Sequence, residues 1–334
     1  MSRLARLSLA GFLTATLLLA AAGGWLAWFA MTPLRVSEEA RELLIPKGRP
    51  FSWVADELVR TGVLDEGWTM RVLARVLGRA HSVQAGVYRL PERVTPYRLL
   101  EMLANGEVTE AQITFIEGWT FAQMRMALAQ HPLVGQETVE LSEVELLRRI
   151  GAEERRAEGL FFPDTYNFSP GAADWRILAR AYQTMRSRLE RLWDTRAPGL
   201  PYASPYEALI MASIVEKETG LESERPLIAA VFVNRLKRGM RLQTDPAVIY
   251  GLGSGFDGNL RRRDLETDTP YNTYTRAGLP PTPIAMPGQG ALEAALRPAA
   301  TSALYFVARG DGSSHFSSNL PDHNAAVRRY QLGR

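Results

Sequence analysis

The longest apolar run of the chain lies near its N-terminus, where residues 7–34 contain no charged side chain. A helix of about 20 apolar residues crosses the ~30 Å hydrocarbon core of a bilayer, and this run is longer than that. Arg3 and Arg6 precede the run, and Trp25 and Trp28 lie toward its far end, as in an aromatic belt. The pattern predicts a single transmembrane anchor within residues 1–35, with the N-terminus in the cytoplasm.

A cleavable signal peptide is the alternative interpretation of this segment. Residues 20–22 are three alanines and offer an Ala-x-Ala cleavage site. The apolar stretch continues past that site as far as Met31, which is longer than the core of a signal peptide normally extends. We therefore favour a retained anchor in the cell inner membrane, and either interpretation places the rest of the chain outside the cytoplasm.

Residues 36–110 show short apolar segments that alternate between strand and helix periodicity. Apolar positions three to four apart predict helices over 51–60, 68–77 and 95–103, and strands are expected over 36–46 and 85–90. This pattern indicates a small α+β subdomain. A strand, glycine turn and helix at 44–60 recur weakly from residue 115, which is typical of a repeated glycan-binding module but is also a common local unit.

Residues 111–334 predict a larger α+β domain. A charged helix is expected over 141–159, and an amphipathic helix follows between residues 175 and 192. Helices over 204–220 and 227–236 come next, then a segment at 269–284 that is too rich in proline for regular structure, and a buried strand at 303–308. The predicted division is therefore an anchor at 1–35, a subdomain at 36–110 and a domain at 111–334.

Composition excludes several classes of function. The chain has 46% hydrophobic and 22% charged residues, and its net charge of +3 is spread among acidic neighbours without a long basic run, which disfavours nucleic-acid binding. There is no cysteine, and the four histidines show no ligand spacing, so we predict neither a metal site nor a cofactor. The sequence contains no phosphate-binding glycine loop, Gly-x-Ser-x-Gly motif or metalloprotease histidine pair.

The helix expected over 204–220 has signals at both ends. Ser204 is a typical N-cap with Pro205 at the first helical position, Glu207 is placed to complete a capping box, and Gly220 is placed for a left-handed C-terminal residue. At about 100° per residue, the apolar residues of the helix gather on one arc, and Glu218 falls near the middle of that arc.

A carboxyl at the end of an apolar stripe is desolvated, which raises its pKa and keeps it protonated near neutral pH, as a general acid requires. The sequence therefore favours Glu218 as a catalytic acid. Glu216 falls on the opposite side of the helix and carries no such expectation. The alternative is that Glu218 is an ordinary helix-end residue paired with a neighbouring cation, Lys217, Arg225 or Arg235.

Several blocks in one order resemble the endolytic murein transglycosylase family, also called YceG-like. Residues 211–219 read Met-Ala-Ser-Ile-Val-Glu-Lys-Glu-Thr, residues 231–236 read Val-Phe-Val-Asn-Arg-Leu, and residues 239–246 read Gly-Met-Arg-Leu-Gln-Thr-Asp-Pro. Later blocks at 264–267, 271–274, 278–281 and 304–307, and Pro-Asp-Thr at 163–165, continue the match. The resemblance extends from the apolar N-terminal run to residue 324.

The resemblance implies a lyase that cuts peptidoglycan without water. The expected reaction breaks the β-1,4 bond between N-acetylmuramic acid and N-acetylglucosamine, leaves a 1,6-anhydromuramyl end and terminates nascent strands near the membrane. It also implies that the second glutamate of Glu-Lys-Glu, Glu218, is catalytic, and that residues 36–110 are similar to a LysM glycan-binding module. Peptidoglycan strands, the membrane and cell-wall synthases are the implied partners.

Loop residues with polar or aromatic side chains are the expected lining of the site. The candidates for substrate binding are Gln243, Asp245, Tyr271, Asn272 and Tyr274. Each is equally suited to bracing a loop. A hydrolase would need a second carboxylate, for which Asp245 and Glu222 are available, and a membrane-tethered glycan-binding scaffold without catalysis is the alternative from another class.

Overall fold

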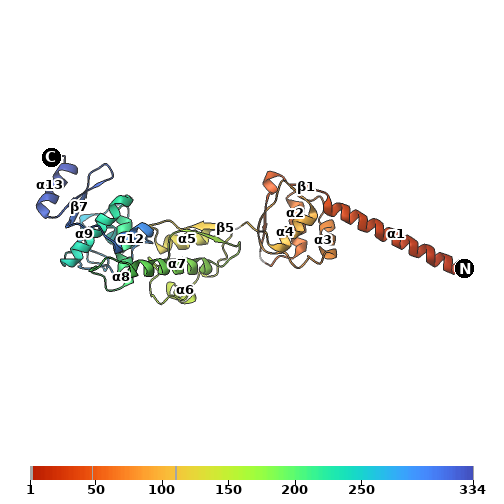
Figure 1. Cartoon of the computed structure of the whole chain (residues 1–334), viewed down its shortest axis with the longest axis horizontal. Coiled ribbons are helices and arrows are strands. Elements are labelled where there is room, and N and C mark those ends of the chain that lie inside the picture. The colour runs from red at the N-terminus through yellow and green to blue at the C-terminus, as the bar shows by residue number, and fades with distance from the viewer. Residues whose placement is uncertain (1–2, 47, 110, 334) are drawn as a thin grey trace. The chain divides into compact units, whose positions relative to one another are not determined.

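The computed structural model describes residues 3–46, 48–109 and 111–333. Two compact units make up the fold, and Figure 1 labels their elements. The first unit contains Met1–Gln112 and Asn167–Ala172, and the second contains Ile113–Tyr166 and Ala173–Arg334. Helices and short strands are mixed, as an α+β fold requires. The functional division predicted at residues 35/36 and 110/111 stays a prediction.

The first unit begins with α1 (Arg3–Met31), in which Gly11–Met31 is long and apolar enough to cross a membrane. Four short strands, one 3-10 turn and three further helices follow α1. The elements after α1 are β1 (Leu34–Arg35), a 3-10 turn (Glu38–Ala40), β2 (Glu42–Ile45), α2 (Phe51–Arg60), α3 (Gly67–Val76), β3 (Gly86–Arg89), β4 (Arg93–Val94) and α4 (Pro96–Asn105). Strand β1 pairs with β4 and β2 pairs with β3, both antiparallel.

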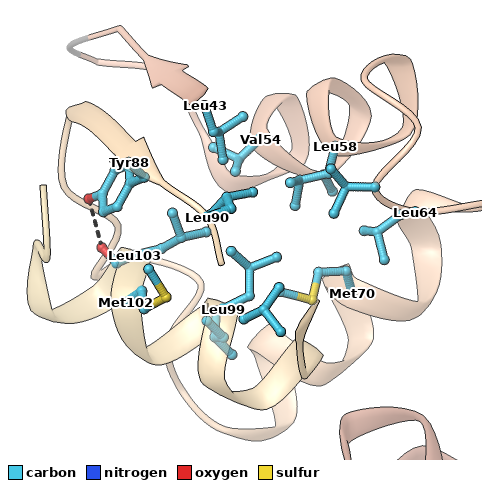
Figure 2. Close-up of a cluster of buried hydrophobic side chains, with 14 of the residues drawn as sticks. Leu43, Val54, Leu58, Leu64, Met70, Tyr88, Leu90, Leu99, Met102 and Leu103 are labelled. Atoms are coloured by element: carbon cyan, nitrogen blue, oxygen red, sulfur yellow. Dashed lines mark hydrogen bonds between the residues drawn. The ribbon is translucent and has the colours of Figure 1, made fainter. Parts of the chain in front are cut away.

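A single hydrophobic core holds the first unit together, as Figure 2 shows. Leu43 on β2, Leu58 on α2, Met70 on α3 and Leu99 on α4 all point into it and are buried. The hydroxyl of Tyr88 donates to the Leu103 carbonyl at 3.2 Å, which satisfies the one polar group of that ring. The predicted helices of this unit are confirmed, whereas the strand expected over 36–46 is limited to β2.

The second unit consists mainly of helices around α8. Strands β5 (Ala111–Thr114) and β6 (Thr165–Phe168) pair with each other, and Ile113–Thr114 and Thr165–Tyr166 are the parts of them that belong to this unit. Strands β7 (Tyr305–Ala308) and β8 (Ser314–Ser317) form an antiparallel hairpin. The helices of this unit are α5 (Phe121–Gln130), α6 (Glu143–Arg149), α7 (Asp174–Asp194), α8 (Pro205–Glu218), α9 (Arg225–Lys237), α10 (Asp245–Leu252), α11 (Arg262–Glu266), α12 (Gln289–Leu296) and α13 (Leu320–Tyr330), with 3-10 turns at Glu222–Glu224 and Gly253–Gly255.

Helix α8 is the centre of this unit because α7, α9, α10 and α12 all pack against it. Its start is as predicted: Ser204 Oγ accepts from the Glu207 amide at 3.3 Å, and Pro205 is the first helical residue. The Glu207 carboxylate caps the amide of Ala203, at 2.7 Å, one residue earlier than a standard capping box. These contacts fix where α8 begins, and so which residues lie at its other end.

Three local predictions for the second unit were wrong. The charged helix expected over 141–159 is confined to α6, because the residues after Ile150 form turns and loops. Helix α8 ends at Glu218 with Thr219 extended, and Gly220 is not left-handed. The predicted one-sided apolar arc is also absent, because every residue from 208 to 215 is buried. The burial of Glu218 therefore has another origin.

Candidate active site

A cavity of about 560 Å³ lies at the C-terminal end of α8, between α9, the start of α10 and the β7–β8 hairpin with α13. Polar, aromatic and apolar side chains from these elements line it, together with the carboxyl groups of Glu218 and Asp245. The lining residues are Glu218, Phe232, Arg235, Leu242, Gln243, Asp245, Tyr274, Phe306, Val307, Ala308, Ser314, His323, Val327 and Gln331.

Glu218 is the last residue of α8 and enters this cavity. Thr244 Oγ1 donates to Glu218 Oε2 at 2.9 Å. Burial is the largest cause that raises the pKa of Glu218 to about 7, and the negative charge of Asp245 also raises it. The Thr244 hydrogen bond and the positive charge of Arg235 lower this pKa, but by less. Such a carboxyl is substantially protonated at neutral pH and can donate a proton to a bound molecule.

Arg235 on α9 is the buried cation of the cavity wall. Its guanidinium donates to the carbonyl of Leu304 at 2.7 Å, to the carbonyl of Leu242 at 2.8 Å and to Gln243 Oε1 at 3.3 Å. These bonds connect α9 to two other segments, the loop that precedes α10 and the residue that precedes β7. Because its donors are engaged with neutral acceptors, Arg235 does not form an ion pair that would hold Glu218 ionised.

Asp245 and Tyr274 come together in the cavity wall. The Tyr274 hydroxyl donates to Asp245 Oδ1 at 2.6 Å, and both residues line the cavity. Burial raises the pKa of Tyr274, and its bond to the Asp245 carboxylate raises it further, so the phenol stays protonated. The structure thus places a second carboxylate near Glu218, with its position fixed by a phenol.

Gln243 lines the cavity in an unusual backbone conformation. It has φ of +54°, and it is the one non-glycine residue with positive φ in the described part of the chain. Its amide donates to the Thr273 carbonyl at 3.2 Å and its side chain accepts from Arg235. Left-handed backbone at a non-glycine residue is strained and clusters at functional sites.

Tyr271 and Asn272 do not line this cavity, and their role in substrate binding stays a prediction. The Tyr271 ring packs edge-on against Tyr250 with centroids 4.9 Å apart, and its hydroxyl bonds to Thr282 Oγ1 at 2.8 Å. Asn272 is fully buried, and its amide nitrogen donates to the carbonyls of Leu265 at 3.0 Å and Thr267 at 2.7 Å. Both side chains brace the loop that carries Tyr274.

Glu216 is also buried, although the sequence suggested no burial for it. Its Oε2 accepts from the Gly288 amide at 2.9 Å and its Oε1 lies 3.4 Å from Arg225 Nη2. Burial raises its pKa, and the Gly288 amide and Arg225 act against that rise. A Cβ at Gly288 would overlap the Glu117 carboxyl, so that side chain would have to move if residue 288 were larger. Glu216 therefore joins α8 to the start of α12.

Thr244 and Glu158 are chemically notable residues that the sequence did not single out, and Arg235 was named only as a possible ion-pair partner of Glu218. Glu158 is buried; its Oε1 accepts from the Phe121 amide at 3.0 Å and its Oε2 from the Tyr250 hydroxyl at 3.1 Å. Burial raises its pKa to about 7 in spite of both bonds. It does not line the Glu218 cavity. A raised pKa alone thus does not single out Glu218, and the cavity is what separates the two carboxyl groups.

His323 on α13 contributes an imidazole to the cavity wall. The ring stacks on Tyr305 with centroids 5.1 Å apart, and its Nδ1 is buried with no hydrogen-bond partner in the described part of the chain. Burial lowers its pKa, so the imidazole is neutral at physiological pH. No group of three or more histidine, aspartate or glutamate side chains in the described ranges is arranged to hold a metal ion.

The sequence profile of the YceG-like family matches residues 43–329, which is about 86% of the 334-residue chain. The chain belongs to the YceG-like family. The match covers α8 to α12, the β7–β8 hairpin, α13 as far as Arg329, and most of the first unit after α1. The predicted resemblance is thereby confirmed.

Relatives agree with this assignment. The chain is 33% identical to a protein of Bacillus subtilis named endolytic murein transglycosylase, over 86% of this chain and 83% of the relative. It is 28% identical to a Streptococcus pneumoniae protein of the same name, over 85% of this chain and 57% of that longer protein. A crystal structure of a YceG-like protein from Listeria monocytogenes superposes with a TM-score of 0.54 at 28% identity, covering 86% of this chain and 99% of the other.

Proposed function

We propose that this YceG-like protein is a peptidoglycan lytic transglycosylase with Glu218 as its catalytic acid and base. Its curated relatives are named endolytic murein transglycosylases. The observation that carries the proposal is a single carboxyl group with a pKa of about 7, placed in a cavity of about 560 Å³. The substrate is the glycan strand of peptidoglycan, cut within the strand at the β-1,4 bond between N-acetylmuramic acid and N-acetylglucosamine.

The reaction needs one carboxyl group because the substrate supplies its own nucleophile. Glu218 donates its proton to the bridging oxygen as the bond from that oxygen to the muramyl anomeric carbon breaks. The C6 hydroxyl of the same muramyl residue then bonds to that carbon, and its proton passes to the Glu218 carboxylate. The products are a 1,6-anhydromuramyl end and a free hydroxyl, and the enzyme returns to its starting state.

The surroundings of Glu218 suit both halves of this cycle. Burial and the negative charge of Asp245 favour the protonated acid before the bond breaks. The Thr244 hydroxyl and the Arg235 charge favour the carboxylate that exists once the proton has left. The resulting pKa near 7 lies close to neutral pH, where a group that both donates and accepts a proton is most effective.

Gln243, Asp245 and Tyr274 are the proposed sugar-binding residues, because they line the same cavity as Glu218. Tyr271 and Asn272 are proposed to act on the substrate only through the loop that they brace. Glu222 is exposed on a 3-10 turn and does not line the cavity. A hydrolytic mechanism needs a second carboxylate, and of the two that the sequence suggested only Asp245 lies in the cavity.

The first unit suggests where the enzyme works. We propose that α1 anchors the chain in the cell inner membrane with its N-terminus in the cytoplasm, and that residues 36–110 act as a LysM-like glycan-binding subdomain. An anchored enzyme of this kind acts on strands as they are made and terminates their elongation. Cell-wall synthases are the corresponding protein partners.

Product analysis tests the proposal. The purified protein is incubated with isolated glycan strands, and the products are identified by mass spectrometry. The wild type is expected to release anhydromuramyl ends, and Glu218→Gln to lose at least about 100-fold of this activity, since general acid catalysis contributes about 10²–10⁴-fold. Glu158→Gln is the matched control, because its pKa is also raised to about 7 but its side chain lies outside the cavity.

The alternatives give different results in the same experiment. Undiminished anhydromuramyl release from Glu218→Gln would refute the assignment of Glu218. Reducing ends in place of anhydromuramyl ends would indicate a hydrolase that uses Asp245. Binding of strands without any product would indicate the glycan-binding scaffold.

A further inference from the structure

The outer face of α3 in the first unit carries a stripe of exposed apolar side chains. Trp68, Val72 and Val76 are 49%, 38% and 67% exposed. They are spaced four residues apart, so they lie on one face of the helix. The opposite face is buried through Met70, Leu73 and Ala74. Helix α3 is therefore apolar on both faces, and only one of them is covered by protein.

This stripe is continuous with the proposed membrane anchor. The Trp68 ring stacks on the Trp25 ring of α1, with centroids 5.5 Å apart and planes 12° apart. Leu26 and Phe29 of α1 pack against the core of the first unit, and Ala30 is buried in it. Figure 1 shows α3 beside the end of α1. The last turns of α1 are thus part of the first unit.

The length of α1 sets the depth at which α3 lies. A helix that enters the hydrocarbon at Leu7, just after Arg6, reaches Trp25 about 27 Å further along its axis, at about 1.5 Å per residue. Entry at Gly11 places Trp25 about 21 Å along. Both values lie within the ~30 Å hydrocarbon core, so Trp25 reaches at most its outer boundary. The ring stacked on Trp25 must then contact lipid as well.

Two exposed arginines near the stripe fit the same location, although the Glu66 carboxylate also lies there and accepts from Trp68 Nε1 at 2.5 Å. Arg75 on α3 and Arg79 just after it are exposed. A helix that lies at a membrane surface typically has an apolar face with tryptophan and a flank of basic residues that attract anionic lipid headgroups. The neighbouring Arg71 pairs with Asp56 at 3.0 Å and so supports the fold of the unit.

We propose that α3 lies in the headgroup region of the leaflet from which α1 emerges, with Trp68, Val72 and Val76 against lipid. This inference rests on the proposed membrane anchor. It assigns the first unit a second, peripheral contact with the membrane, so the unit is held against the lipid surface and does not stand free above it.

The natural absence of cysteine makes the test direct. Single-cysteine variants Val72→Cys and Val76→Cys of the full chain are labelled with a nitroxide and reconstituted into vesicles of phosphatidylethanolamine and phosphatidylglycerol. Accessibility to dissolved oxygen and to a water-soluble nickel complex is measured by electron paramagnetic resonance. Leu44→Cys on β2 is the matched control, because Leu44 is 45% exposed but lies outside the stripe.

The labels at residues 72 and 76 are expected to be severalfold less accessible to the nickel complex, and more accessible to oxygen, than the label at residue 44. Equal nickel accessibility at all three positions would overturn the inference. Spin–spin broadening at residue 76 without a gain in oxygen accessibility would assign the stripe to a second copy of the chain and would overturn it too.

A label at Leu18→Cys, within α1, separates this inference from the anchor on which it rests. If the label at residue 18 is buried in lipid while residues 72 and 76 are open to nickel, the anchor stands and the α3 contact is wrong. If residue 18 is itself open to nickel, both are wrong. Strand cleavage, measured separately on the same preparations, reports on Glu218 and not on either result.

A second variant tests the role of the stripe. Val72→Asp, combined with the label at residue 76, places a charge on the apolar face, and the label is expected to regain the nickel accessibility of residue 44. Because the Val72 side chain is exposed, the variant should melt within a few degrees of the wild type. Unchanged shielding of residue 76 in a folded Val72→Asp variant would contradict a lipid contact made through this stripe.

Discussion

At the scale of single residues, the pKa of Glu218 reflects opposing contributions from identified neighbours. Burial raises it, Thr244 and Arg235 lower it, and Asp245 raises it. An acid that must be protonated to act loses activity as the pH rises through its pKa. The alkaline limb of the pH–activity profile therefore reports on Glu218, and each neighbour should move that limb in a known direction.

Thr244→Val and Asp245→Asn should move this limb in opposite directions. Thr244→Val removes a hydrogen bond to the carboxylate, so the pKa of Glu218 rises and the limb moves to higher pH. Asp245→Asn removes a negative charge, so the pKa falls and the limb moves to lower pH. The measurement is kcat/KM for strand cleavage between pH 5 and 9, about two units either side of a pKa near 7. Shifts of the same sign would show that another group controls the limb.

Gln243 tests the strain in the cavity wall. Gln243→Val should lower the free energy of unfolding by about 1–3 kcal/mol, because a β-branched residue is poorly tolerated at φ of +54°. Gln243→Gly accepts this conformation and is the control, with stability close to that of the wild type. Urea denaturation measures both. Equal losses for Val and Gly would attribute the effect to the lost Arg235 contact and not to the backbone.

At the scale of elements, α8 holds two glutamates in different surroundings. Glu216 faces Arg225 and the Gly288 amide, whereas Glu218 faces the cavity. Glu218 follows Glu216 by two positions, which rotates the side chain by about 200° around the helix axis, so these two close neighbours in sequence have separate surroundings. The end of the helix also favours a neutral Glu218, because the C-terminal end of a helix dipole is negative.

Glu216→Gln should therefore be a stability variant. It leaves Arg225 without its nearest carboxylate, and a loss of about 1–3 kcal/mol is expected because a partner in a largely buried ion pair is removed. Strand cleavage per folded molecule should stay within severalfold of the wild type. Glu117→Gln is the control, since its half-exposed carboxyl lies 3.6 Å from Arg225 and should contribute less than about 1 kcal/mol. Loss of cleavage in a stable Glu216→Gln variant would make Glu216 part of the reaction.

At the scale of the whole molecule, buried carboxyl groups link the stability of the second unit to pH. Glu158 joins the start of α5 to α10, and its pKa is raised from 4.5 to about 7. Between these two pH values the folded chain keeps a proton that the unfolded chain has lost. The stability from this group is therefore fully present below about pH 4.5 and is lost as the pH rises through about 7.

Glu158→Gln should weaken this dependence. The wild type is expected to lose about 1–3 kcal/mol of stability through Glu158 between pH 5 and pH 8, and the glutamine variant should lose correspondingly less. Urea denaturation at the two pH values measures the difference. Glu218→Gln should act in the same direction, because its pKa is raised to a similar value. Identical pH dependence in the wild type and Glu158→Gln would show that Glu158 is ionised in the folded protein.

The sequence alone determined the features that depend on neighbours along the chain. The apolar run became α1, the Ser204 and Pro205 signals became the start of α8, and the ordered blocks identified the family. Capping and periodicity involve residues within a few positions of one another, so their spacing is sufficient evidence. The choice of Glu218 also came from the sequence, but the one-sided apolar arc behind it does not exist, because residues 208–215 of α8 are buried on all sides.

Only the tertiary structure decided what surrounds that carboxyl group. Thr244, Arg235 and Asp245 meet Glu218 through the packing of α8, α9 and α10, and α13, about 100 residues further along the chain, contributes His323 and Val327 to the cavity wall. The tertiary structure also determines that Asn272 holds a loop by hydrogen bonds to backbone carbonyls. It likewise buries Glu158 against Tyr250, away from the Glu218 cavity. Desolvation and charge act through space over a few ångströms, so the raised pKa of Glu218 depends on the folded arrangement of segments that the sequence places far apart.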